Sequence, residues 1–163
     1  MSFSQSLFFI VLLILAGAFF SVAEIALAAS RRLRLRQLAD EGDARALQVL
    51  RVQEQPGSYF TTVQVSVNVI AILGGIVGEG LFSPYFAAVL RLWLPEGTAA
   101  VLAFAGSVAL VTSLFVIFSD LMPKRLGLAE PERLAMALVG PMQKVLLLLG
   151  PAVWFYNQCA NLL

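Results

Sequence analysis

The chain has 163 residues, of which 60% are hydrophobic and 13% are charged, with one cysteine, no histidine and a net charge of +1. Soluble domains are about 45–50% apolar and about 25% charged, so this composition excludes a soluble surface, a disulfide framework, a Cys/His zinc site and histidine-dependent catalysis. It also argues against nucleic acid as a partner, and it predicts a small, all-α integral membrane domain that is not an enzyme.

Three charge-free runs define the expected membrane spans. They cover residues 1–23, 55–78 and 97–119, and each is long enough for the roughly 20 apolar residues that cross a bilayer. We therefore predict three transmembrane helices, at about 3–29, 57–80 and 98–121.

The segment between the first two spans is rich in arginine. Residues 31–56 predict a helical hairpin, because apolar residues recur at helical spacing on both sides of a turn at 40–43, where Gly42 is a natural C-cap. Its arginines can contact anionic lipid headgroups, or the segment can be a solvated connector. The sequence leaves these two alternatives open.

The third span is followed by a proline. The run Asp120-Leu-Met-Pro123-Lys124-Arg125 predicts a break in the helix, because the residue before a proline is steered away from helical geometry. A backbone loosened beside a carboxylate can expose carbonyl oxygens to an ion.

A fourth apolar stretch, residues 134–163, contains Lys144 and two prolines, Pro141 and Pro151. Prolines ten residues apart are expected to break or kink a spanning helix. We therefore predict juxtamembrane helices over 129–163 that lie along the bilayer or only partly enter it. A fourth full span is the alternative.

Basic residues orient these segments. They are concentrated in 31–56 and after Pro123, whereas the loop between the second and third spans contains only Arg91. Because basic loops stay on the cytoplasmic side, both basic segments are predicted to be cytoplasmic. The N-terminus is then outside, and the C-terminus is cytoplasmic.

Polar side chains within the spans are candidate functional residues, because at membrane depth they cost several kcal/mol unless they are partnered or hydrated. Helical spacing places Ser21 and Glu24 on one face of the first span, and Gln64 and Asn68 on one face of the second, with Ser66 pointing elsewhere. Such hydroxyl, amide and carboxylate oxygens suit Mg²⁺ or another oxygen-preferring cation. They also suit a diammonium ligand, since each ammonium group has three donors.

Several polar residues also have a structural interpretation. Thr61, Thr112 and Ser113 are expected mainly to form hydrogen bonds within their own helices or to pack against small residues. Glu24 can form an ion pair with an arginine such as Arg31, and the sequence does not separate this role from a functional one.

The second span also carries small residues at helical spacing. Gly74 and Gly78 form a small-xxx-small pair, which predicts close approach of another helix from the same or a second chain. Glu79 follows this pair. It is either an ordinary carboxylate at the membrane interface or a residue of an exit vestibule.

Four segments together resemble the transmembrane domain of the CorC/CNNM family: FFSVAEIALAAS, RRLRLRQLADEG, YFTTVQVSVNVIAILGG and FSDLMPKRLG. The resemblance implies a homodimer within membrane lipid, with three spans plus cytoplasmic juxtamembrane helices, and a role in Mg²⁺ and Co²⁺ efflux. Members of the family continue into a pair of CBS domains and often a small C-terminal domain. We expect these domains to be absent here. The resemblance assigns nucleotide binding to the CBS domains, so it is expected only through those missing domains and not from this chain itself.

The resemblance also implies a cation site. Ser21 and Asn68 match the family's ligands, Gln64 stands in place of a serine, Asp120 in place of a glutamate, and Ser119 in place of a glycine. Aspartate is shorter than glutamate and glutamine is longer than serine, so for Mg²⁺, which requires oxygens at about 2.0–2.1 Å, the two changes must compensate or the substrate differs. The predicted set is therefore Ser21, Gln64, Asn68, Ser119 and Asp120, with Glu24 and Ser66 as secondary candidates and Pro123 and Lys124 as the helix-breaking turn.

The function predicted first is a cation exporter of the bacterial inner membrane, with Mg²⁺ as the transported or bound ion. The segments ADEG, AILGGIVGE and DLMPKR look most similar to a bacterial subgroup associated with export of the diamines cadaverine and putrescine, which is the first alternative. A membrane anchor that regulates other transporters and transports nothing itself is the second.

Overall fold

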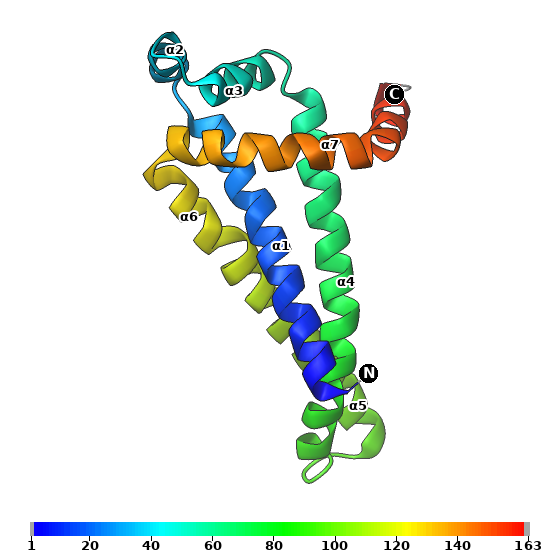
Figure 1. Cartoon of the computed structure of the whole chain (residues 1–163). Coiled ribbons are helices and arrows are strands. Elements are labelled where there is room, and N and C mark those ends of the chain that lie inside the picture. The colour runs from blue at the N-terminus through cyan, green and yellow to red at the C-terminus, as the bar shows by residue number, and fades with distance from the viewer. Residues whose placement is uncertain (1, 162–163) are drawn as a thin grey trace. The chain divides into compact units, whose positions relative to one another are not determined.

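The computed structural model describes residues 2–161, with side chains as far as Cys159, and all of its regular elements are helical (Figure 1). This confirms the all-α prediction for the described part of the chain. The elements in order are α1 (Phe3–Ala29), α2 (Arg32–Asp40), α3 (Ala44–Glu54), α4 (Gly57–Leu90), α5 (Glu96–Leu114), the π-helix η1 (Phe115–Leu121), α6 (Met122–Ala129) and α7 (Pro131–Asn161).

Four helical stretches are long and apolar enough to cross a membrane: Phe3–Ala29, Gly57–Leu90, Glu96–Ala129 and Pro131–Cys159. The first three contain the predicted spans. Because Pro131–Cys159 meets the same criteria, length and composition by themselves also allow the alternative of a fourth span.

Prolines do not interrupt the helices as the sequence predicted. Pro141 and Pro151 both lie inside the continuous helix α7, and Pro123 lies inside a helical run that passes from η1 into α6. The physical reason is that a proline removes one backbone hydrogen bond, whereas ending the helix would leave up to four donors or four acceptors without helical partners. The prediction of a helix break at Pro123 is therefore wrong.

The chain divides into two compact units. Unit 1 contains the chain up to Ala18 together with Asn68–Met122, and unit 2 contains Phe19–Val67 together with the chain from Pro123 onward. The division falls within α1 and within α4, so each of these helices contributes to both units.

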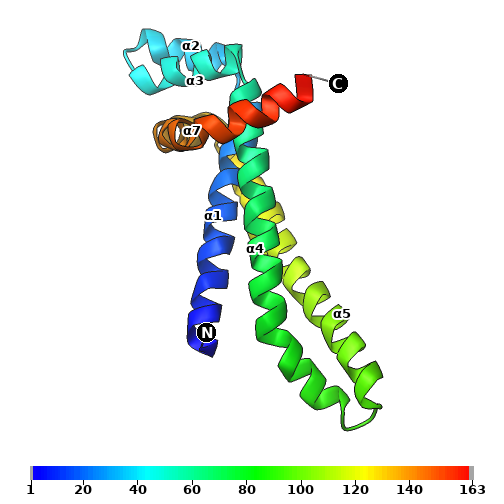
Figure 2. The same ribbon diagram turned by 90° about the vertical axis from the view of Figure 1, so that its right-hand side faces the viewer.

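Unit 1 is held together by close approach at glycines. A Cβ atom at Gly74 would overlap the ring of Phe115, and one at Gly78 would overlap the methyl groups of Val111. α4 and α5 accordingly lie side by side (Figure 2). The close approach predicted for the Gly74/Gly78 pair is confirmed, and it occurs within one chain.

Unit 2 has the main described apolar core. Its members come from five helices, with Ala23, Ala26 and Leu27 of α1, Leu35 of α2, Ala46 and Val49 of α3, Tyr59 and Val63 of α4, and Ala135, Val139 and Met142 of α7. Within this unit α7 runs across the last turns of α1 and the first turns of α4, and α3 packs on it (Figure 1, Figure 2).

The turn between α2 and α3 has a defined local chemistry. Gly42 has a φ of 100°, a left-handed conformation that glycine adopts without steric cost. Asp43 then caps α3 by accepting a hydrogen bond from the backbone N–H of Arg45 at 2.9 Å. The Arg45 guanidinium also donates to this carboxylate and lowers the pKa of Asp43, so the interaction is lost as the pH falls through that lowered pKa.

Candidate functional site

The residues predicted to form the site belong to both units. Ser21, Glu24, Gln64, Ser66, Pro123 and Lys124 lie in unit 2, whereas Asn68, Ser119 and Asp120 lie in unit 1. Each group is described within its own unit. Their assembly into a single site stays a prediction from the sequence.

In unit 2, Glu24 of α1 pairs with Lys124 of α6, with 3.6 Å between the carboxylate Oε2 and the ammonium Nζ. The two helices approach closely at Gly127, where a Cβ atom would overlap the side chain of Ile25. The partner of Glu24 is thus a lysine distant in sequence, because helix packing and not proximity along the chain selects it. The alternative of Arg31 as its partner is wrong, since Arg31 pairs with Glu132.

Two serines of unit 2 are buried. Ser21 on α1 is 1% exposed and Ser66 on α4 is 7% exposed. Among the described residues, the Ser66 hydroxyl has no hydrogen-bond partner, which is unusual because buried polar groups are nearly always satisfied. Its neighbour Thr62 instead donates to the Ser58 carbonyl one turn earlier, the in-helix bond that satisfies a hydroxyl without a ligand.

The amides of α4 lie on a different side of that helix. Gln64 and Asn68 are exposed, whereas Ser66, between them in sequence, is buried. Asn68 follows Gln64 by four positions, which places the two amides on one helical face. An exposed amide at membrane depth needs water, a ligand or another helix as its partner.

In unit 1, Ser119 and Asp120 lie within the π-helix η1. The N–H of Met122 donates to the carbonyl of Ile117, five residues earlier, which is the π pattern. Ser119 is buried where α1 approaches closely, since a Cβ atom at Gly17 would overlap its hydroxyl; Asp120 is half-buried. Single π-helical turns are often found at functional sites.

The π-helix was not predicted, although the sequence contains a signal for it. Pro123 has no N–H, so a carbonyl of the preceding turn, at Phe118 or Ser119, loses its helical donor. A wider turn next to that position accommodates the loss without ending the helix. The signal for this arrangement in the sequence is a serine and an aspartate just before a proline in an apolar run.

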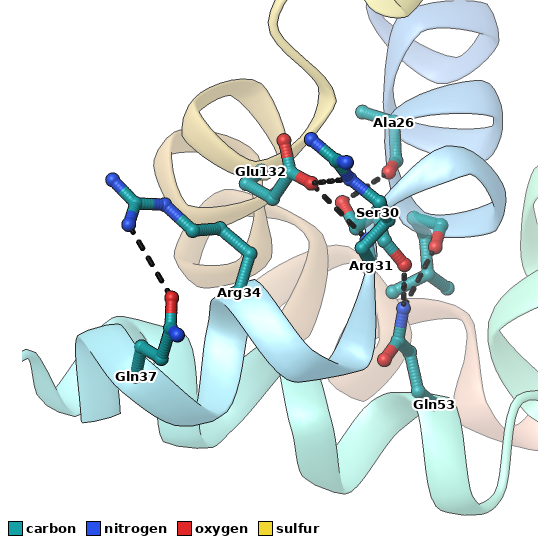
Figure 3. Close-up of polar contacts among 8 residues, drawn as sticks. Ala26, Ser30, Arg31, Arg34, Gln37, Gln53 and Glu132 are labelled. Atoms are coloured by element: carbon teal, nitrogen blue, oxygen red, sulfur yellow. Dashed lines mark hydrogen bonds and ion pairs between the residues drawn. The ribbon is translucent and has the colours of Figure 1, made fainter. Parts of the chain in front are cut away.

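The polar groups that tie α1, α2 and α3 together were also missed by sequence reasoning (Figure 3). The Gln53 amide donates to the carbonyls of Leu27 and Ser30 at 3.1 and 3.0 Å, so it caps the C-terminal end of α1. Arg31 reaches Glu132 of α7 at 3.4 Å. No spacing rule reveals these contacts, because the partners are distant in sequence.

The donor set restricts what the chain can bind. Within residues 2–161 no three aspartates, glutamates or cysteines gather as a metal-binding group would require. Any cation bound by the predicted residues is therefore held mainly by hydroxyl and amide oxygens with few carboxylates.

The chain matches the model of one protein family, described as the cyclin M (CNNM) transmembrane N-terminal domain, over residues 8–163. It is 47% identical over 157 residues to the polyamine export protein of Salmonella typhimurium and 46% identical over 159 residues to that of Escherichia coli K12. A UPF0053 protein of Bacillus subtilis is 33% identical over 160 residues.

These matches cover almost all of the chain but a minor part of each relative. They include 96%, 98% and 98% of this chain, respectively, and 35%, 36% and 35% of the three relatives. The chain thus spans about a third of the length of the curated relatives it matches.

Proposed function

The chain belongs to the cyclin M (CNNM) transmembrane N-terminal domain family, and from this premise we propose that it is the membrane domain of a polyamine exporter. The observation that carries the proposal is the identity of 46–47% to two polyamine export proteins over nearly the whole chain. It supports diamine export better than the Mg²⁺ and Co²⁺ efflux that the sequence first suggested.

The chemistry of the predicted residues suits such a substrate. A diammonium chain carries three N–H donors at each end, and hydroxyl and amide oxygens accept them without octahedral geometry. In this proposal Asp120 neutralises one ammonium group, and Ser21, Gln64, Asn68 and Ser119 contribute neutral acceptors. Release on the other side follows a change from an inward-open to an outward-open arrangement of the spans.

The proposed topology has three spans, formed by α1, α4 and the helical run Glu96–Ala129. α7 lies along the cytoplasmic surface, because within unit 2 it runs across α1 and α4 and not alongside them. The arginines of α2 and α3 support a cytoplasmic location for this side of the inner membrane, with the N-terminus outside. The proposal includes a homodimer, in which the exposed apolar helix faces contact lipid or the second copy.

Uptake of radiolabelled cadaverine into proteoliposomes tests this function. We expect transport by the wild type and at least a tenfold loss in Asp120→Asn, because a charge-assisted hydrogen bond is removed. Glu130→Gln is the matched control, since it removes an exposed carboxylate outside the predicted set. Unlabelled Mg²⁺ is added as a competitor.

Three results would contradict parts of the proposal. Full transport by Asp120→Asn would remove that residue from the site. Transport of Mg²⁺ with no cadaverine uptake would restore the metal-efflux function. A properly folded protein that moves neither cation under any ion gradient would favour a membrane anchor.

A further inference from the structure

Unit 1 has an open groove of about 360 Å³ between α4 and α5. Its walls are aliphatic and aromatic, with Ile72 and Ile76 on α4 and Phe104 and Val108 on α5. Among the described residues that line it, Glu79 carries the ionisable group. No residue of the predicted cation set lines this groove, so it is a separate feature of the fold.

The carboxylate of Glu79 differs from that of Glu24 in its partners. Among the described residues no arginine or lysine lies within ion-pair distance of it, although the other half-buried glutamate on a spanning helix, Glu24, pairs with Lys124. Glu79 is half-buried against these apolar walls, near the end of the predicted span, where a carboxylate is stabilised by water or by a cation. A cation bound in the groove would partner this carboxylate.

The walls indicate what kind of cation fits. Methylene groups pack against isoleucine and valine side chains, as in any apolar contact. The ring of Phe104, which is 55% exposed, can take an ammonium group against its face. A hydrated metal ion would gain nothing from such walls, because it keeps its water ligands.

We infer that this groove is a binding site for a primary alkylammonium group, with the ammonium on Glu79 and the methylene chain along Ile72 and Ile76. The inference rests on the proposed function in one respect, since it makes the groove a second binding site that the polyamine occupies after the predicted cation set. With the proposed topology the groove lies in the half of the span nearer the outside.

Helix geometry shows how much of a ligand the groove can hold. Asn68 lies on the same face of α4 as Glu79, three helical turns earlier, at a rise of about 16 Å. Helical side chains lean toward the N-terminus, which displaces the Glu79 carboxylate and the Asn68 amide in the same direction and leaves their separation along the helix unchanged. An extended five-carbon diamine has about 7 Å between its nitrogens, so a diamine bound at Glu79 does not reach the Asn68 amide, and the groove holds one ammonium group and its methylene chain.

Photoaffinity labelling of the purified protein in lipid nanodiscs tests the site without depending on transport. The probe is an aliphatic amine that carries a diazirine, compared with the neutral alcohol of the same length. We expect the amine to label residues 71–79 and 104–108, and labelling to fall about tenfold in Glu79→Gln. Glu96→Gln is the matched control, because Glu96 is an exposed α5 carboxylate outside the groove.

Filling the groove provides a second test that leaves Glu79 unchanged. A Cβ atom at Gly75 or at Gly80 meets nothing within 4 Å, but only Gly75 lines this groove. Gly75→Leu is therefore expected to block labelling by the amine, and Gly80→Leu to leave it unchanged. Both variants replace glycine by leucine in the same helix, so a general effect on helix stability would be shared.

The outcomes separate this inference from the proposed function. Labelling of the groove that depends on Glu79, with no cadaverine transport, would support the alkylammonium site and contradict polyamine export. Cadaverine transport with labelling unaffected by Glu79→Gln would overturn the site and leave export standing. Equal labelling by the neutral alcohol would also overturn it, and would identify the groove as a contact for lipid chains.

Discussion

Hydroxyl side chains in the helices fall into two chemical groups. Thr62 and Ser113 donate to carbonyls one turn earlier, at Ser58 and Ala109, so their polarity is satisfied within the helix. Ser66 is buried without a partner among the described residues. Residue type by itself does not reveal whether a hydroxyl is satisfied within its own helix.

The Glu24–Lys124 ion pair is a residue-scale feature with a small expected energy. Its side chains are 31% and 36% exposed, so solvent screens the pair and a coupling of about 0.5 kcal/mol is expected. A double-mutant cycle of Glu24→Gln and Lys124→Gln, followed by denaturant unfolding in detergent, measures this coupling. A value above about 2 kcal/mol would show that the pair is shielded from water in the membrane.

Gly78 and Gly80 offer a matched test of helix packing. Alanine at Gly78 must displace Val111, whose branched side chain is stiff, so Gly78→Ala is expected to destabilise the protein by about 1–3 kcal/mol. Alanine at Gly80 meets nothing within 4 Å and is expected to stabilise the helix by up to about 1 kcal/mol. Thermal unfolding of both variants checks the prediction, which equal shifts would contradict.

At the scale of elements, the π-helix η1 determines how Ser119 and Asp120 are presented. A π turn contains more residues than an α turn, so it rotates the side chains that precede Pro123 relative to a regular helix. The sequence indicated that this position is irregular. It did not indicate that the irregularity is a widened turn, because a proline is also compatible with a helix that ends.

Replacing Pro123 tests this role. Pro123→Ala restores the missing N–H and allows η1 to relax to an α-helix, so cadaverine transport is expected to fall by about tenfold while the unfolding temperature stays the same or rises. Pro141→Ala, in the interior of α7, is the control for loss of a helical proline. Amide hydrogen exchange over 115–121 reports the backbone change, and altered exchange with unchanged transport would separate η1 from function.

At the scale of the whole molecule, the open question is the number of spans. Composition admits four, whereas the packing of α7 across α1 and α4 in unit 2 favours three. The contacts of α7 with α3 favour the same topology, because α3 is part of the arginine-rich segment that is predicted to be cytoplasmic.

The single cysteine of the sequence decides between the two topologies. Cys159 is exposed near the end of α7. If α7 lies on the cytoplasmic surface, a membrane-impermeant maleimide is expected to label Cys159 in inside-out vesicles and not in right-side-out vesicles. The control is Arg45→Cys in the α2–α3 hairpin, in a Cys159→Ser background, and it is expected to show the same sidedness. Labelling of Cys159 from the opposite side would show that α7 spans the membrane.

Much of the fold could be predicted from the sequence, because insertion into a bilayer depends mainly on the length and polarity of each segment. The all-helical class, the first three long apolar helices and the close approach at Gly74 and Gly78 follow from such local patterns. Of the candidate site, the sequence identified the polar positions. It could not say that Ser66 is buried and Asn68 exposed, because both are compatible with the same helix.

What the sequence by itself determined is therefore the membrane character of the chain and the few places where polar groups interrupt its apolar helices. Only the tertiary structure decided that the helices continue through Pro123, Pro141 and Pro151, that Glu24 pairs with Lys124, and that α7 crosses its neighbours within unit 2. These features depend on contacts between residues far apart in the chain. Helix packing selects those contacts, and no local pattern of charge or hydropathy encodes them.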